Sequence, residues 1–377
     1  MLIRFSRLLR LSGVVLGLGL AATAALASRR KVIIDQDAFG PGGPNLQPIL
    51  MVMQSPDFEV LGITIESGDG WQKENTAHTL RMLELIGRTD IPVIAGATYP
   101  LLNTEEGTRR WEKIYGNLPY KGAWMDVWPD YNTVNRNRYH AADIVPPMEE
   151  GEPTTKPLPE TAANFIIRKV REFPGEVTIL AMGPFTNLAL AARLDDGFAA
   201  QAQELVIMGG SFNPRAPQLD EFAMQFIHNP RVEFNSRWDP EAAHMMLHAG
   251  WKKITAVPND ATTATKLTPD LVKRATAAST LLAKYVARYA QPGFPMWDEV
   301  AAGILLDPTI IKHSEKVAMD IDTDHGATYG ATLSWPAGKG PHLGEPDVTA
   351  VLEIDVPKLE QQFVTLFTQP APGQGAK

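Results

Sequence analysis

Two aspartates and an asparagine near the start of the chain have side chains that could bind a polar ligand. Asp35 and Asp37 directly follow an apolar run, and Asn45 lies just beyond a segment rich in glycine and proline. Carboxylates accept hydrogen bonds and protons, and an amide both accepts and donates. The spacing therefore indicates a candidate ligand site, with the alternative that the two aspartates simply cap a turn, as Asp commonly does.

The neighbouring residues predict a strand, a loop and a helix that position these side chains. The run from Val32 to Ile34 is β-branched throughout, as expected for a strand buried on both faces of a parallel sheet. Residues 39–44 hold three glycines and two prolines, which must turn the chain. Asn45 is then the expected N-cap of a helix ending at Gln54. Ligands of open α/β sheets bind outside the carboxyl ends of the strands, where Asp35 and Asp37 would lie.

The alternation of strands and helices continues along the chain. A second strand is expected at residues 60–66, with helical spacing of apolar residues after it, and a long helix rich in Ala and Leu is expected from Asp270. Further strands are expected at about residues 91–94, 176–180, 205–208 and 253–257. This pattern predicts an α/β fold with an open, mostly parallel central sheet and helices on both faces.

The N-terminal residues predict export. Residues 1–27 carry Arg4, Arg7 and Arg10, then an apolar run over 11–20, and end in small residues at 25–27. This is the pattern of a cleaved signal peptide, with a retained membrane anchor as the alternative. The apolar run is shorter than a spanning helix needs, and no later segment is long and apolar enough to span. We therefore expect a periplasmic or secreted protein without a stable membrane span after cleavage.

Charge and cysteine content exclude several classes of function. Removing the predicted signal peptide changes the net charge from −8 to −11, which disfavours nucleic acid and anionic membranes as partners. The chain has no cysteine, and hence neither a disulfide, nor a thiolate metal site, nor a Cys nucleophile. A hydrophobic core must therefore supply the stability.

One domain is expected over residues 28–368, because no repeat or composition break divides the chain. An insertion at about 103–160 departs from regular patterns and is rich in aromatic residues, which argues against disorder. It is interpreted as a lid or an interface, or alternatively as a structural flap on the solvent side. Residues 369–377 are expected to form a flexible tail. The aromatic residues of the insertion are Trp111, Tyr115, Tyr120, Trp124, Trp128 and Tyr131.

A series of short motifs resembles the nucleoside hydrolases, in the order in which that family carries them. The family signature DxDPGxDDAxAL, followed by ASPE and LLGIT, resembles the stretch from Asp35 to Thr64. The resemblance extends from about Val32 to Val356 and implies a Rossmann-like fold. The later matching motifs are AMGPFTNLA at 181–189, VIMGG at 206–210, EFN at 233–235, DPEAA at 239–243, WDE at 297–299 and TYGAT at 328–332.

The resemblance implies hydrolysis of the N-glycosidic bond of ribonucleosides with the help of calcium. The resemblance implies that the metal ligands are Asp37, Asn45, the main-chain carbonyl of Met182 and Asp298. Asp37 would also be the general base that takes a proton from water. The family's two adjacent aspartates fall on Pro44 and Asn45 here, so one acid is lost and one becomes neutral. Because calcium affinity follows the charge of the ligands, we expect a weak calcium site.

The same resemblance implies where a nucleoside would bind. Glu233 and Asn235 would hold the ribose hydroxyls, Asn229 would join them with Asn213 as the other candidate, and Asp69 would touch the nucleoside. Trp297, which stands where many relatives have His, implies stacking on a purine base. The stacking role competes with core packing, which is the commoner use of tryptophan.

Two other functions stay open at this point. The chain could be an exported nucleoside or sugar receptor that has lost catalysis, or a hydrolase of another N-glycoside. The expected partner is in each case a small molecule, and a homo-oligomer is a further expectation.

Overall fold

The computed structural model describes residues 29–127, 138–213 and 230–370. The predicted signal peptide, Trp128, Tyr131, Asn229 and most of the predicted tail lie outside these ranges. Within them, no helix is long and apolar enough to cross a membrane.

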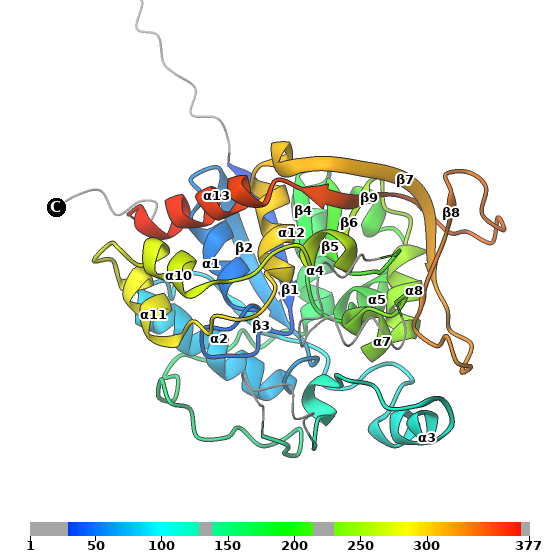
Figure 1. Cartoon of the computed structure of the whole chain (residues 1–377), viewed down its shortest axis with the longest axis horizontal. Coiled ribbons are helices and arrows are strands. Elements are labelled where there is room, and N and C mark those ends of the chain that lie inside the picture. The colour runs from blue at the N-terminus through cyan, green and yellow to red at the C-terminus, as the bar shows by residue number, and fades with distance from the viewer. Residues whose placement is uncertain (1–28, 128–137, 214–229, 371–377) are drawn as a thin grey trace, which may run out of the picture.

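A nine-stranded sheet in the order β3-β2-β1-β4-β5-β6-β9-β7-β8 forms the centre of the described structure (Figure 1). The first seven strands in that order pair in parallel, whereas β7 pairs antiparallel with both β9 and β8. The predicted α/β fold with a mostly parallel sheet is confirmed. The strands are β1 (Arg30–Gln36), β2 (Phe58–Ile65), β3 (Val93–Ala95), β4 (Val177–Ala181), β5 (Glu204–Met208), β6 (Ile254–Val257), β7 (Ile311–Ile321), β8 (Thr332–Pro336) and β9 (Asp347–Ile354).

Helices cover both faces of the sheet (Figure 1). Helices α1, α2 and α10 to α13 pack on one face, and α4, α5 and α8 pack on the other. The helices are α1 (Gln47–Gln54), α2 (Gln72–Ile86), α3 (Glu105–Tyr115), α4 (Ala162–Glu172), α5 (Thr186–Leu194), α7 (Phe234–Trp238), α8 (Pro240–Leu247), α9 (Asn259–Thr262), α10 (Pro269–Ala275), α11 (Leu281–Tyr289), α12 (Trp297–Leu306) and α13 (Val356–Thr368).

Strand β1 is held from both faces and both sides. Val32 and Ile34 point into one hydrophobic layer and Ile33 into the other, since successive side chains of a strand alternate. All three are fully buried, and truncating a side chain of this kind to Ala typically costs about 2–5 kcal/mol. With β2 and β4 paired on its two sides, β1 is a rigid base for the residues at its carboxyl end.

Two predicted helix features are wrong. Leu46, not Asn45, occupies the N-cap of α1, because the side chain of Asn45 donates instead to Asp37. The long helix expected from Asp270 is two helices, α10 and α11, because the hydroxyl of Thr280 caps a new start by accepting from the Ala283 N–H.

Candidate active site

Asp37 follows directly after β1 and is buried with both carboxylate oxygens engaged. Its Oδ1 accepts from Asn45 Nδ2 at 2.9 Å, and its Oδ2 accepts from the Asp69 N–H at 2.7 Å. Gly68 makes this approach possible, because a Cβ at that position would overlap Asp37 Oδ2. The loop after β2 therefore folds directly onto the Asp37 carboxylate.

Asp35 has a structural role that distinguishes it from Asp37. Its Oδ1 accepts from Thr64 Oγ1 at 2.5 Å and from Asn187 Nδ2 at 2.9 Å, which ties β1 to β2 and to α5. Burial raises the pKa of Asp35 to about 6. The two aspartates of the motif thus serve different purposes.

Gln36 connects the first motif with the distant α12. Its Nε2 donates to the Asn45 carbonyl at 3.0 Å and to Asp298 Oδ2 at 2.8 Å, and its Oε1 accepts from the Asp37 N–H at 2.8 Å. Asp298 lies in the first turn of α12, where the helix dipole favours a negative charge. The structure thereby brings Asp37, Asn45 and Asp298 together.

The electrostatics of this group favour a bound cation. Burial, and then the negative charges of Asp69 and Asp298, raise the pKa of Asp37 well above its ordinary value. Burial likewise raises the pKa of Asp298, and the charges of Asp69 and Glu233 add to that effect. Among the described residues, neither Asp37 nor Asp298 has a lysine or arginine partner. Crowded carboxylates without a basic partner are a suitable donor set for a hard divalent cation.

Asn235 holds the carbonyl of Met182, the residue that directly follows β4. Its Nδ2 donates to the Met182 carbonyl at 3.0 Å and to the Met208 carbonyl at 3.1 Å, across the ends of β4 and β5. A carbonyl oxygen has two lone pairs, so this hydrogen bond leaves one free for a cation.

Glu233 is the N-cap of α7 and presents its carboxylate to the backbone. It accepts from the Asn235 N–H at 2.7 Å and from the Ser236 N–H at 3.1 Å. Burial raises the pKa of Glu233 to about 7 in spite of these hydrogen bonds. The short helix α7 thus holds Glu233 and Asn235 near the ends of β4 and β5.

The aromatic-rich insertion packs against Asp69, which follows β2. Tyr120 Oη donates to Asp69 Oδ1 at 2.7 Å, and the Ala123 N–H donates to the Gly68 carbonyl at 2.9 Å. Burial raises the pKa of Asp69 to about 6. The phenol of Tyr120 therefore lies against the Asp69 carboxylate.

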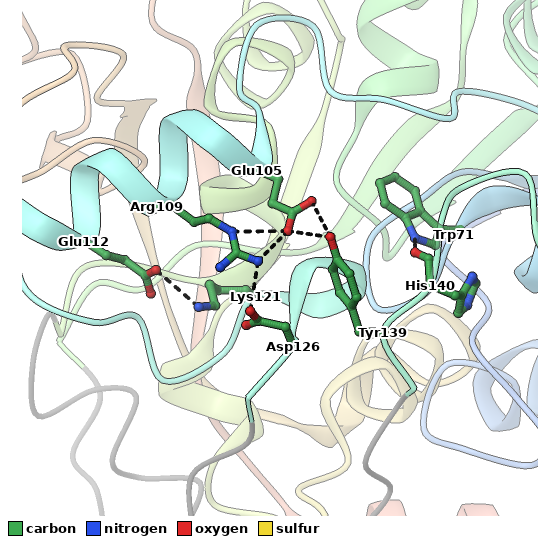
Figure 2. Close-up of polar contacts among 8 residues, drawn as sticks. All are labelled: Trp71, Glu105, Arg109, Glu112, Lys121, Asp126, Tyr139 and His140. Carbon is green, nitrogen blue, oxygen red and sulfur yellow. Dashed lines mark hydrogen bonds and ion pairs between the residues drawn. The ribbon is translucent and has the colours of Figure 1, made fainter.

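Stacked indoles attach the insertion to α7. The ring of Trp124 stacks on that of Trp238 with centroids 3.9 Å apart, and Trp71 meets Trp238 edge-on at 6.3 Å. Trp71 Nε1 also donates to the carbonyl of His140, which lies in the second half of the insertion (Figure 2).

Polar contacts within the insertion fix its shape. Glu105 on α3 accepts from Arg109 at 2.7 Å and from the Tyr139 hydroxyl at 2.9 Å (Figure 2). Arg109 also pairs with Asp126 at 2.9 Å. These contacts join the start of the insertion to two later stretches of it.

Comparison with known proteins decides the family. The profile described as "Inosine-uridine preferring nucleoside hydrolase" matches residues 32–361. The chain belongs to this nucleoside hydrolase family. It is by this membership an N-glycosyl hydrolase, and the family resemblance found in the motifs is confirmed.

Individual nucleoside hydrolases resemble the chain in sequence and in fold. Uridine nucleosidase 1 of Arabidopsis thaliana is 34% identical over 252 residues, which span 67% of this chain and 63% of the relative. A solved plant nucleoside hydrolase is 24% identical with a TM-score of 0.66, covering 90% of this chain and 99% of its own. A purine-preferring ribonucleoside hydrolase from Gardnerella vaginalis is 20% identical with a TM-score of 0.67, covering 91% and 99%. The two structures show the fold.

Of three further predicted substrate residues, the structure describes Trp297 and Asn213. The ring of Trp297 packs partly against the larger core, 6.1 Å from that of Phe294. The Asn213 N–H donates to Asp260 Oδ1 at 2.8 Å, and Asn229 is outside the described residues. The predicted roles of Trp297 and Asn229 in this nucleoside hydrolase stay predictions.

The motifs in the sequence did not predict the contacts made by Gln36, Glu66 and Tyr120. Glu66, directly after β2, accepts from the N–H groups of Phe185 and Asn187, both at 2.8 Å, and so shapes the turn that follows Met182. A Glu at the end of an otherwise apolar strand was the available signal for it. Gln36 offered a comparable signal, since a polar residue between two aspartates in a buried strand needs partners.

Proposed function

We propose that this nucleoside hydrolase cleaves the N-glycosidic bond of ribonucleosides with Asp37 as general base. The observation that carries the proposal is the pair of hydrogen bonds from Gln36 Nε2, which places Asn45 and Asp298 beside Asp37 across 262 positions of the chain. These groups are buried at the carboxyl ends of parallel strands, which is where ligands of this fold are expected to bind.

The residues present fit a calcium ion. Asp37, Asp298, the Asn45 side-chain oxygen and the Met182 carbonyl offer only oxygen donors, which Ca²⁺ takes. A bound calcium ion would polarise water and the lower ribose hydroxyls. The raised pKa values of Asp37 and Asp298 indicate that the protein alone does not compensate their charges.

The side chains of the chain have separate tasks in this proposal. Asp37 takes the proton from the attacking water, and its orientation is fixed by Asn45 and the Asp69 N–H. Glu233, the N-cap of α7, and Asn235 in its first turn would hold the ribose hydroxyls, since a carboxylate and an amide together can accept from and donate to a diol. The transition state is oxocarbenium-like, so holding the sugar is part of catalysis.

We propose a purine-leaning preference, supported by an aromatic wall beside Asp69. The rings of Tyr120 and Phe234 lie 4.8 Å apart, one from the insertion and one from α7. Stacking of a base on such a surface contributes roughly 1 to 3 kcal/mol. The curated relative named a uridine nucleosidase makes uridine the competing substrate.

Release of free base from inosine, guanosine, adenosine and uridine, each with and without calcium, tests the proposal. Asp37→Ala is expected to abolish turnover, and the matched control Asp57→Ala, at an exposed aspartate just before β2, is expected to retain it. Turnover that survives Asp37→Ala would contradict the assignment of the base. Nucleoside binding without turnover in the unaltered protein would favour the receptor alternative.

We further propose that the protein is exported through residues 1–27, as a periplasmic or secreted enzyme. N-terminal sequencing of the mature protein tests this proposal. A mature chain that begins at Ser28 supports export with cleavage, and an intact N-terminus on a membrane-bound protein supports the retained anchor.

A further inference from the structure

Two histidines and an aspartate converge on the edge of the molecule where α8 packs against β7 (Figure 1). His244 lies in the last turn of α8, His248 is the residue that caps this helix, and Asp320 lies near the end of β7. None of the three contributes to the proposed reaction.

The nitrogen and oxygen atoms of this cluster point toward one another. His244 Nδ1 lies 2.7 Å from Asp320 Oδ1, and His248 Nε2 lies 3.1 Å from Asp320 Oδ2. The two imidazole rings are 4.2 Å apart, and one ligand atom from each of the three residues lies within 4.8 Å of the others. Ligand atoms already this close need only small side-chain movements to meet one ion.

The surroundings of the cluster suit a cation and leave it accessible. The side chains of His244, His248 and Asp320 are 38%, 20% and 16% exposed, so an ion and its water ligands can enter. The histidines lie at the carboxyl end of α8, where the helix dipole favours positive charge. Glu241, one turn earlier on α8, adds a negative charge that acts on His244.

We propose that His244, His248 and Asp320 bind a divalent transition metal ion of the zinc type. Two histidines one helical turn apart and a carboxylate from a neighbouring strand supply three ligands, and water completes the coordination. Imidazole nitrogen suits zinc, nickel and copper, whereas calcium takes oxygen ligands. The site is therefore chemically distinct from the cluster around Asp37.

A metal at this site would join α8 to the antiparallel part of the sheet. Asp320 belongs to β7, which pairs with both β8 and β9, and α8 follows directly after α7. Since an ion that binds the folded chain in preference to the unfolded chain stabilises the fold, zinc is expected to raise the unfolding midpoint.

Zinc titration by calorimetry, with calcium in excess to occupy the oxygen site, tests the proposal independently of catalysis. One zinc ion is expected per chain. His244→Ala/His248→Ala is expected to weaken binding by more than about 100-fold, because even the loss of a group that only orients a ligand costs 10 to 100-fold. Asp320→Asn, which keeps the size of the side chain, is expected to weaken it to a smaller degree.

His313→Ala is the matched control, because His313 is an exposed histidine on the same strand and lies 3.0 Å from Glu315. It is expected to bind zinc as the unaltered protein does. Thermal melts in EDTA identify any variant that is misfolded, and if the double variant is misfolded, Asp320→Asn decides. No zinc binding in the unaltered protein, or unchanged zinc binding in the folded variants, overturns the proposal.

Discussion

Replacing Asn45 by Asp restores the acid that the family resemblance places at this position. The structure predicts that, without metal, this substitution lowers the free energy of unfolding by a large amount. Asn45 Nδ2 now donates to Asp37 Oδ1 at 2.9 Å. A hydrogen bond to a charged group contributes about 1.5–3 kcal/mol, and Asn45→Asp removes it. Two carboxylate charges at the same 2.9 Å would repel by about 6 kcal/mol at an effective dielectric constant of about 20.

The combined cost, about 7–9 kcal/mol, is comparable to the whole free energy of unfolding of an ordinary protein. We therefore expect Asn45→Asp to share a proton with Asp37. Its unfolding midpoint should fall strongly at pH 8 without metal and recover toward pH 5. Calcium at 100 times its dissociation constant should return about 2.7 kcal/mol of stability.

Thermal melts at the two pH values, with EDTA or with calcium, measure these effects. Asn45→Ala is the control, because it removes the hydrogen bond without adding charge. It should respond little to calcium, and between pH 5 and 8 its stability should change no more than that of the unaltered protein. If Asn45→Asp melts like Asn45→Ala in EDTA at pH 8, the two side chains are not in contact and the account of the site is wrong. The same conclusion follows if calcium stabilises Asn45→Asp no more than it stabilises the unaltered protein.

Three further predictions concern the same site. Tyr120→Phe removes the 2.7 Å hydrogen bond to Asp69 and should lower the free energy of unfolding, measured in urea, by about 1.5–3 kcal/mol. An unchanged free energy of unfolding would count against the packing of the insertion on Asp69. Gly68→Ala should lower kcat at least about tenfold, because a Cβ would displace the Asp37 carboxylate and a misplaced catalytic group slows the reaction. Full activity would show that the loop after β2 can shift to accommodate the Cβ. Without metal, the free energy of unfolding should fall as pH rises from about 4 through 7. Burial raises the pKa values of Asp69 and Glu233 to about 6 and about 7, so in this range the folded chain holds protons that the unfolded chain has released. Unfolding midpoints that stay constant across this range would exclude this linkage.

Local patterns in the sequence predicted the fold well, because burial on both faces of a strand leaves a continuous β-branched run such as Val32 to Ile34. The N-cap at Asn45 failed because a tertiary partner, Asp37, bound the side chain that the helix start would otherwise use. Tertiary contacts of this kind leave no trace in helical or strand spacing.

The site itself was accessible only through the order of the motifs. No local pattern links Asp298 with Asp37, since the contact is made through Gln36 between residues 262 positions apart. The contact between Tyr120 and Asp69 could not be predicted either, because an irregular segment has no periodicity from which to infer where its side chains lie.

The indoles of Trp71, Trp124 and Trp238 come from three separate segments and pack together, so their arrangement gives an optical signal. Rings with centroids 3.9 Å apart couple electronically, and circular dichroism of the indoles depends on their mutual orientation. Any departure of the insertion from α7 would separate Trp124 from Trp238 and change that spectrum. The three indoles thus report whether the insertion stays packed on α7, and its movement can be followed without attaching a dye.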